Sequence, residues 1–176
     1  MYDSLIASIE RSPVVDRNGY PYFVHPLTDG VPPMDPAVLR EVLDWMLRVG
    51  NFDCDVIVPL ALELGKPYVV IRKKKYGLPG EVALEQQTGY SKSTMYINGI
   101  RPGMRVTVVD DVVSTGGTMI ALIRALTETV GAKITDIVIP VDKGDGENLV
   151  EKATGLRIKS LVRVKIADNR AVCTLC

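Results

Sequence analysis

The chain has 176 residues, which is enough for one globular domain with a buried core. Lys plus Arg and Asp plus Glu both number 21, so the zero net charge gives no sign of a nucleic-acid partner. No apolar run is long enough to span a bilayer, and the first residues show no secretory pattern. We expect a single domain over residues 1–176, cytoplasmic, with no nucleic-acid or membrane partner.

The first 35 residues predict one short helix and then irregular chain. Apolar residues share one helical face within residues 3–11, and Ser12-Pro13 ends that helix. Five prolines from Pro13 to Pro33 argue against regular structure over most of that segment. Aromatic residues are nevertheless dense there, which is typical either of a lid over a ligand or of rings that cover a core edge. Both interpretations stay open.

A second helix is predicted to begin at Asp35-Pro36, with Asp35 as N-cap, and to end at Gly50. Two strands are then expected, over residues 54–59 and 68–71. Only eight residues separate them, whereas a parallel crossover with its helix takes about 10 to 12 residues. Either this connection is unusually short, or residues that normally stand between Pro59 and Leu60 are missing.

Four consecutive cations come after the second of these strands, at Arg72, Lys73, Lys74 and Lys75. They suit a solvated sheet edge that discourages aggregation. They equally suit a polyanion, because the planar guanidinium of Arg72 matches phosphate oxygens and the lysines add point charges. Residues 81–98 continue with polar residues between two strand-like pieces.

Residues 106–118, V-T-V-V-D-D-V-V-S-T-G-G-T, carry the strongest functional signal. A buried strand ends in paired acids, and two valines and a glycine-containing turn lead into a helix. Glycines let the backbone turn tightly, and the N–H groups at the helix start attract a phosphate with help from hydroxyls. Carboxylates before a phosphate site suit a sugar phosphate. The residues concerned are Asp110, Asp111, Val112, Val113, Ser114, Thr115, Gly116, Gly117 and Thr118.

This stretch resembles, without gaps, the ribose-phosphate signature of type I phosphoribosyltransferases. The resemblance implies an α/β fold with a mostly parallel central sheet, helices on both faces and a small N-terminal hood formed by residues 1–35. It also implies that Ser114 to Thr118 hold the 5-phosphate. Asp110 and Asp111 would be the catalytic residues, binding the ribose hydroxyls and stabilising positive charge on the sugar. Mg²⁺ would act as cofactor through substrate oxygens and waters, with no metal site made by the protein alone.

The same resemblance implies the pyrophosphate site. The basic run is similar to the Arg-Lys-x-x-Lys-Leu-Pro-Gly of adenine-type enzymes, which assigns pyrophosphate binding to Arg72, Lys73 and Lys75. The match is imperfect, because Gly77 stands where that pattern has its second lysine. Residues 72–98 would contain the mobile catalytic loop that closes over the active site.

The rest of the chain predicts a helix over 119–130, a core strand over 134–141 that ends at Asp142-Lys143, a helix over 147–154 and a strand over 158–166. Lys143 is similar in placement to the lysine with which hypoxanthine/guanine enzymes donate to the 6-oxo group of the base. An ordinary turn lysine is an equally good interpretation. Phe23, Val112 and Lys143 would together form the base site. Cys173 and Cys176 form a C-x-x-C that favours incidental thiols over a metal site.

The order of elements resembles archaeal-type hypoxanthine/guanine phosphoribosyltransferases, whose sequences are similar to those of adenine enzymes. It implies a homodimer that joins a purine base to 5-phosphoribosyl 1-diphosphate. One alternative is adenine as the base. Another is a transcriptional regulator that senses the same sugar diphosphate, although the first 35 residues show no helix-turn-helix.

Overall fold

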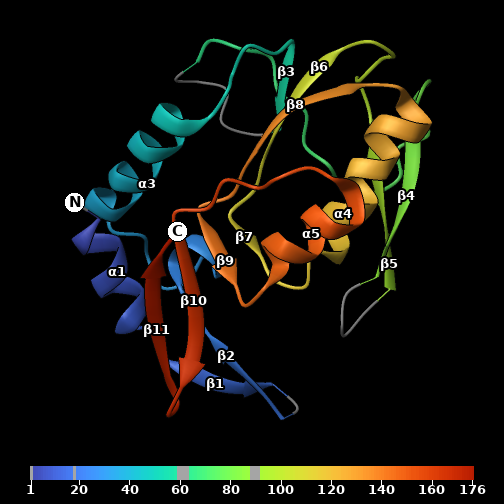
Figure 1. The fold of residues 1–176 in the computed structure, drawn as a ribbon. Coiled ribbons are helices and arrows are strands. Elements are labelled where there is room, and N and C mark those ends of the chain that lie inside the picture. Colours follow the sequence, from blue (N-terminus) through green and yellow to red (C-terminus); the bar gives the residue numbers. More distant parts are fainter. Residues whose placement is uncertain (1, 18, 59–63, 88–91) are drawn as a thin grey trace.

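The computed structural model describes residues 2–17, 19–58, 64–87 and 92–176. Three parallel strands form its centre, in the spatial order β3 (Val56–Val58), β6 (Arg105–Val109) and β8 (Lys133–Val138) (Figure 1). Val106, Val108 and Val109 of the middle strand are at most 5% exposed, because this strand has neighbours at both edges and layers on both faces. Single parallel bridges extend the sheet, from Ile57 to Tyr68 and from Val138 to Lys159.

A second sheet continues from the carboxyl end of the first. It contains β7 (Val112–Val113), β9 (Val141–Lys143), β10 (Val162–Ala167) and β11 (Arg170–Leu175), in the order β11-β10-β9-β7. Its pairs are parallel except for β10–β11. β7 follows β6 after Asp110 and Asp111, and β9 follows β8 after Ile139 and Pro140. The paired acids therefore lie where the chain passes from one sheet to the other.

Helices cover both faces of the central sheet (Figure 1). α1 (Asp3–Glu10) and α3 (Pro36–Val49) pack on one face. α4 (Gly117–Arg124), its π-helical continuation η1 (Ala125–Val130) and α5 (Gly146–Thr154) lie on the other. The Asp35 carboxylate accepts from Ala37 N at 2.8 Å, so the predicted start of α3 is confirmed. The expected α/β fold, with a mostly parallel sheet between helices, is confirmed. No helix in the described part of the chain is both long and apolar enough to cross a membrane.

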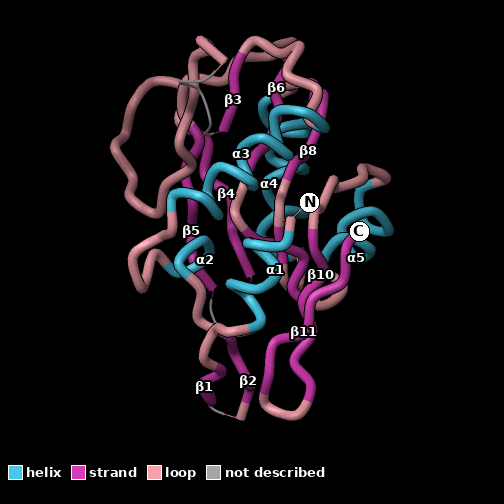
Figure 2. Tube along the Cα trace, turned by 90° about the vertical axis from the view of Figure 1, so that its left-hand side faces the viewer, coloured by secondary structure: helices cyan, strands magenta, loops and turns pink. Residues whose placement is uncertain are grey.

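The N-terminal segment is more regular than the sequence predicted. β1 (Val14–Arg17) and β2 (Tyr20–Phe23) form an antiparallel hairpin, and α2 (Pro26–Asp29) follows it. Pro21 is compatible with this hairpin because an edge strand tolerates a residue without an N–H donor. The expectation of mostly irregular chain was therefore wrong for these residues. Figures 1 and 2 both place the hairpin beside β10 and β11.

Two expectations concern residues 59–98. β4 (Val82–Gln87) and β5 (Lys92–Ile97) agree with the two expected strand-like pieces, and they pair antiparallel. The tip of this hairpin, residues 88–91, lies outside the described residues, so a mobile catalytic loop stays a prediction. The expected strand over 68–71 is instead limited to isolated bridges at Tyr68 and Arg72.

The short connection after β3 lies partly outside the described residues, which stop at Val58 and resume at Leu64. The returning chain is held against β3 by backbone hydrogen bonds from Ile57 N to Pro67 O (3.0 Å) and from Val69 N to Ile57 O (2.9 Å). Lys66 Nζ also donates to Cys54 O at 3.0 Å. The connection therefore returns to the amino end of β3 and runs parallel to it.

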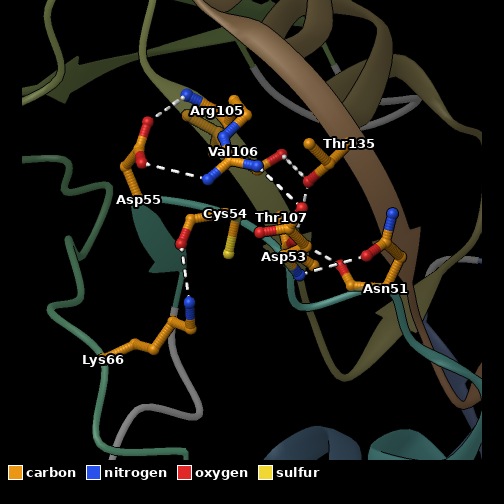
Figure 3. A network of polar contacts seen from close by, with 9 residues as sticks. All are labelled: Asn51, Asp53, Cys54, Asp55, Lys66, Arg105, Val106, Thr107 and Thr135. Carbon is orange, nitrogen blue, oxygen red and sulfur yellow. Dashed lines mark hydrogen bonds and ion pairs between the residues drawn. The ribbon is translucent and has the colours of Figure 1, made fainter.

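A polar network ties the loop before β3 to the central sheet (Figure 3). The Thr107 hydroxyl is fully buried and donates to Asn51 O at 2.7 Å, and it lies 2.9 Å from the Thr135 hydroxyl. Arg105 forms ion pairs with Asp53 at 2.8 Å and with Asp55 at 3.5 Å. Because these ion pairs are exposed to solvent, the buried hydroxyl of Thr107 should contribute more to stability than they do.

We expect Thr107→Val to lower the free energy of unfolding by about 1–2 kcal/mol, because it leaves the carbonyl of Asn51 without its donor. Urea unfolding measures this change. The control is Thr127→Val, which removes an exposed hydroxyl that donates to Ile123 O and should cost less than about 0.5 kcal/mol. Equal stability of the two variants would contradict the role given to Thr107.

Candidate active site

The paired acids stand at the carboxyl end of β6. Asp110 N donates to Val138 O at 3.4 Å. The Asp110 carboxylate accepts from Asp111 N at 3.0 Å. Solvent reaches the Asp110 side chain, but protein surrounds it on several sides. This partial loss of water, followed by the hydrogen bond and charge of Asp111, raises the pKa of Asp110 to about 7. Near neutral pH Asp110 is therefore partly protonated.

Asp110 lines two neighbouring cavities. One, of about 200 Å³, lies on the α4 side between Thr118 and residues of β4 and β5. The other, of about 310 Å³, lies on the α3 side, and Asp111 also lines it. Apolar side chains form most of both walls. A ligand at the acid pair would therefore meet two carboxyls in surroundings that strengthen electrostatic contacts.

The turn after β7 leads directly into α4, as the sequence predicted. Gly116 has φ +72° and stands at the N-cap, and Gly117 begins the helix. The left-handed conformation at this position favours glycine. The first turn of a helix leaves N–H groups without helical acceptors, and these N–H groups attract a phosphate. Ser114, Thr115 and Thr118 place hydroxyls on the same turn.

The first turn of α5 packs tightly against the turn at residues 114–118, the predicted phosphate-binding turn. A Cβ at Gly146 would lie 2.4 Å from Ser114 O and 2.8 Å from a methyl of Val113. A Cβ at Gly116 would lie 2.8 Å from a methyl of Val150. These contacts require glycine at both positions. Sequence reasoning missed Gly146, because nothing local in D-K-G-D-G shows which backbone it will touch.

Lys143 ends β9 and lies beneath the N-terminal hairpin. Its side chain is almost fully buried, and Nζ lies 3.1 Å from the ring centroid of Tyr22, 4.7 Å from that of Phe23 and 5.9 Å from that of Tyr20. Cation–π attraction favours this arrangement. The Tyr22 hydroxyl donates to the Asp29 carboxylate at 2.7 Å, which helps to fix the ring over the lysine.

The structure brings the three predicted base-site residues into one region. Val112 pairs with Val141, two residues before Lys143, and Phe23 lies beside the lysine. Phe23 is only 1% exposed, however, so its ring belongs to the core and offers little surface to a ligand. Tyr22 is the partly exposed ring closest to Lys143, and sequence reasoning did not select it. The density of aromatic residues was the available signal.

The predicted pyrophosphate-binding residues, Arg72, Lys73 and Lys75, are not among the residues that line the two cavities beside Asp110. The guanidinium of Arg72 donates to the Asn98 side chain and stacks over the Tyr76 ring at 4.4 Å. Lys73 and Lys75 are exposed. Val70 and Ile71, just before this run, line the smaller cavity together with Asp110. The basic run therefore begins near the acid pair, and pyrophosphate binding stays a prediction.

No group of three or more His, Cys, Asp or Glu side chains within the described ranges could hold a metal ion. The cysteines are free thiols. Burial raises the pKa of Cys173 to about 12 and also raises that of Cys176. Both thiols are therefore protonated near neutral pH, which makes them poor nucleophiles.

The fold and the site together define the class of protein. The family model described as phosphoribosyl transferase domain matches residues 56–167, which include the paired acids, the phosphate-binding turn and Lys143. The chain belongs to this family.

Within the family, the chain is similar to hypoxanthine/guanine phosphoribosyltransferases of archaea. It is 44% identical to that of Methanocaldococcus vulcanius, over 94% of this chain and 96% of the relative. It is 45% identical to that of Methanobacterium lacus, over 97% of this chain and 95% of the relative.

Solved structures with the same fold include adenine phosphoribosyltransferases. That of Thermoanaerobacter pseudethanolicus superposes with a TM-score of 0.73 at 22% identity, covering 93% of this chain and 99% of that chain. The enzyme of Giardia lamblia, complexed with 9-deazaadenine, superposes with a TM-score of 0.71 at 22% identity, covering 94% and 98%. At this level of identity the likeness establishes the fold only.

The alignments also show that this chain lacks some internal residues that its relatives have. The alignment with the Methanocaldococcus vulcanius protein has 177 positions but spans only 94% of this 176-residue chain. About a dozen residues of that relative therefore have no counterpart here. The connection between β3 and Tyr68 is the one that is short for a parallel crossover.

We expect Gly146→Ala to displace the turn at Ser114 or the start of α5, because the added methyl would lie 2.4 Å from Ser114 O. Overpacking of this kind should lower the free energy of unfolding by about 1–3 kcal/mol and weaken the binding of ribose 5-phosphate. Urea unfolding and calorimetric titration measure the two effects. Asp145→Ala, one residue earlier and exposed, is the control. Unchanged affinity in Gly146→Ala would show that this contact does not constrain the turn.

Proposed function

We propose that this protein transfers the 5-phosphoribosyl group of 5-phosphoribosyl 1-diphosphate to hypoxanthine or guanine, giving IMP or GMP and pyrophosphate. The observation that carries the proposal is that Asp110 and Asp111 lead through β7 into the turn at residues 114–118, while β7 pairs with β9, the strand that ends in Lys143. The archaeal relatives, similar over nearly their whole length, support the same activity.

The phosphate half of the substrate would bind at the start of α4. Residues 114–118 supply N–H groups and hydroxyls to the 5-phosphate, and the ribose hydroxyls donate to Asp110 and Asp111. As the bond from C1′ to the diphosphate breaks and the purine nitrogen attacks C1′, positive charge develops on the sugar. The two carboxylates stabilise that charge because they are already in place when it forms.

The base half would depend on Lys143. A 6-oxo purine accepts a hydrogen bond at the position where the amino group of adenine donates, so an ammonium prefers hypoxanthine or guanine. The Tyr22 ring, which now faces Nζ, would be the nearest aromatic surface for the base. Val112 would contact the base from β7, and Phe23 would support Tyr22 from within the core.

Mg²⁺ would accompany the diphosphate and neutralise it as a leaving group. The donor set fits this cation, because Mg²⁺ is usually held by one or two carboxylates together with substrate phosphates and waters. The raised pKa of Asp110 indicates that no cation in the described part of the chain neutralises the acid pair. Arg72, Lys73 and Lys75 would assist the pyrophosphate. A homodimer in the cytoplasm is also part of the proposal, and sedimentation would test its oligomeric state.

Steady-state rates with hypoxanthine, guanine and adenine test the proposal. We expect the two oxopurines to react faster than adenine. Lys143→Met should raise KM for the oxopurines about tenfold or more, the usual loss for a hydrogen bond to a charged group, and should leave KM for the sugar diphosphate within about twofold. Lys165→Met, on the exposed side of β10, is the matched control. A preference for adenine, or unchanged kinetics in Lys143→Met, would overturn the base assignment.

Binding of the sugar diphosphate should strengthen as pH rises through 7. Asp110 is protonated below its pKa of about 7, and only the ionised form accepts from ribose hydroxyls or attracts Mg²⁺. Loss of one proton should therefore raise affinity about tenfold between pH 6 and pH 8. Calorimetric titration measures the profile. Asp110→Asn should flatten this rise and leave only the titration of the ligand phosphates, so an equally steep profile in that variant would count against Asp110.

A further inference from the structure

Asp142 is a fully buried carboxylate with partners on two elements. Its Oδ1 accepts from Gly146 N at 3.1 Å, and its Oδ2 accepts from Arg163 Nε at 2.9 Å. Arg163 lies on β10 and also donates from Nη2 to Glu147 at 3.1 Å. One cation therefore joins β9 and β10 to the first turn of α5. A buried carboxylate costs free energy unless it is fully paired, and both oxygens of this one are paired.

The charges in this cluster depend on one another. The hydrogen bond to Asp142 raises the pKa of Arg163. Burial, and then the charge of Asp142, raises the pKa of Glu147. Arg163 thus neutralises two acids, and removing either partner of the Asp142–Arg163 pair leaves a charge without its counterion in a partly buried place.

The position of Asp142 connects the two halves of the candidate active site. On one side, Asp142 immediately precedes Lys143 and pairs across the sheet with Val113, the last residue of β7. On the other side, it holds Gly146, which lies so close to the carbonyl of Ser114 in the phosphate-binding turn that a Cβ would clash with it. The same carboxylate therefore fixes both the end of the strand that carries Lys143 and the surface against which Ser114 rests.

We propose that Asp142 is a positioning residue that sets the distance between Lys143 and the phosphate-binding turn. The inference rests on the proposed function, because a purine nucleotide must reach Lys143 with its base and residues 114–118 with its phosphate at the same time. A ligand held at both ends gains affinity only if the two sites keep the matching distance. A ligand held at one end does not depend on that distance.

Asp142→Asn tests this proposal with two probes, GMP and ribose 5-phosphate, titrated calorimetrically. The amide keeps the size of the side chain but carries no charge. In either orientation its NH2 group faces a donor, Arg163 Nε in one and Gly146 N in the other. We expect the affinity for GMP to fall about tenfold or more, while that for ribose 5-phosphate changes less than about threefold. In turnover, KM for both substrates should change less than kcat, because the two reactants are bound but misaligned.

Asp136→Asn is the matched control. Asp136 is also a nearly buried strand carboxylate, its side chain 9% exposed, and it pairs with Lys159. It lies in the middle of β8 in the central sheet, however, where it accepts from Asn51 N in the loop before β3. Its loss should lower stability and leave the ratio of the two affinities as in the wild type. A second test variant, Arg163→Lys, keeps the cation without the planar fork, and should show a smaller loss for GMP in the same direction.

Equal losses for GMP and ribose 5-phosphate in Asp142→Asn, or the same ratio in Asp136→Asn, would overturn the positioning role. If Asp142→Asn does not fold, the ratio in Arg163→Lys decides, and an unchanged ratio there overturns the role as well. Failure of the proposed function is distinguishable, because in that case the wild-type protein would neither bind GMP nor turn over the oxopurines.

Discussion

The placement of Asp110 and Asp111 between two sheets is the constraint on which the rest of the site depends. β6 is the middle strand of the central sheet, and the chain leaves it for β7, which belongs to the other sheet. Ligands of open parallel sheets bind at the carboxyl ends of strands where neighbouring connections diverge. Here the divergence brings the acid pair, the start of α4 and the end of β9 to the same edge.

The partial burial of Asp110, together with the hydrogen bond and charge of Asp111, has a cost in stability. Because the pKa of Asp110 is about 7 when folded and near 3.8 when unfolded, the folded state binds more protons between these values. The acid pair therefore lowers stability as pH rises from about 4 to 7. A site that is destabilised by its own charge binds a cation or hydroxyl donors more strongly, since the ligand relieves the repulsion. Stability here is reduced in favour of binding.

The sequence predicted the parts of the site that are local. Val106 to Thr118 contain their own strand, turn and helix start, so the pattern alone places the acids between the end of β6 and the turn that begins α4. Contacts between distant segments were not predictable in this way. Nothing in the proline-rich N-terminal segment shows that Tyr22 will lie over Lys143. Likewise, nothing in the residues around Gly146 shows that it will lie against Ser114. The hairpin at residues 14–23 forms despite Pro21 because it packs beside β10.

The short connection after β3 bears on how the proposed site would divide its contacts between the diphosphate and the sugar phosphate. Lys66 and Pro67 bring the chain back to the amino end of β3, and the residues between Val58 and Leu64 lie outside the described part of the chain. Relatives have about a dozen more residues along the same alignment. The contacts proposed for the diphosphate come from Mg²⁺ and from the basic run after Ile71, whose arginine donates to Asn98. Under the proposed function, the turn at residues 114–118 and the acid pair would supply most of the specific recognition of the sugar phosphate.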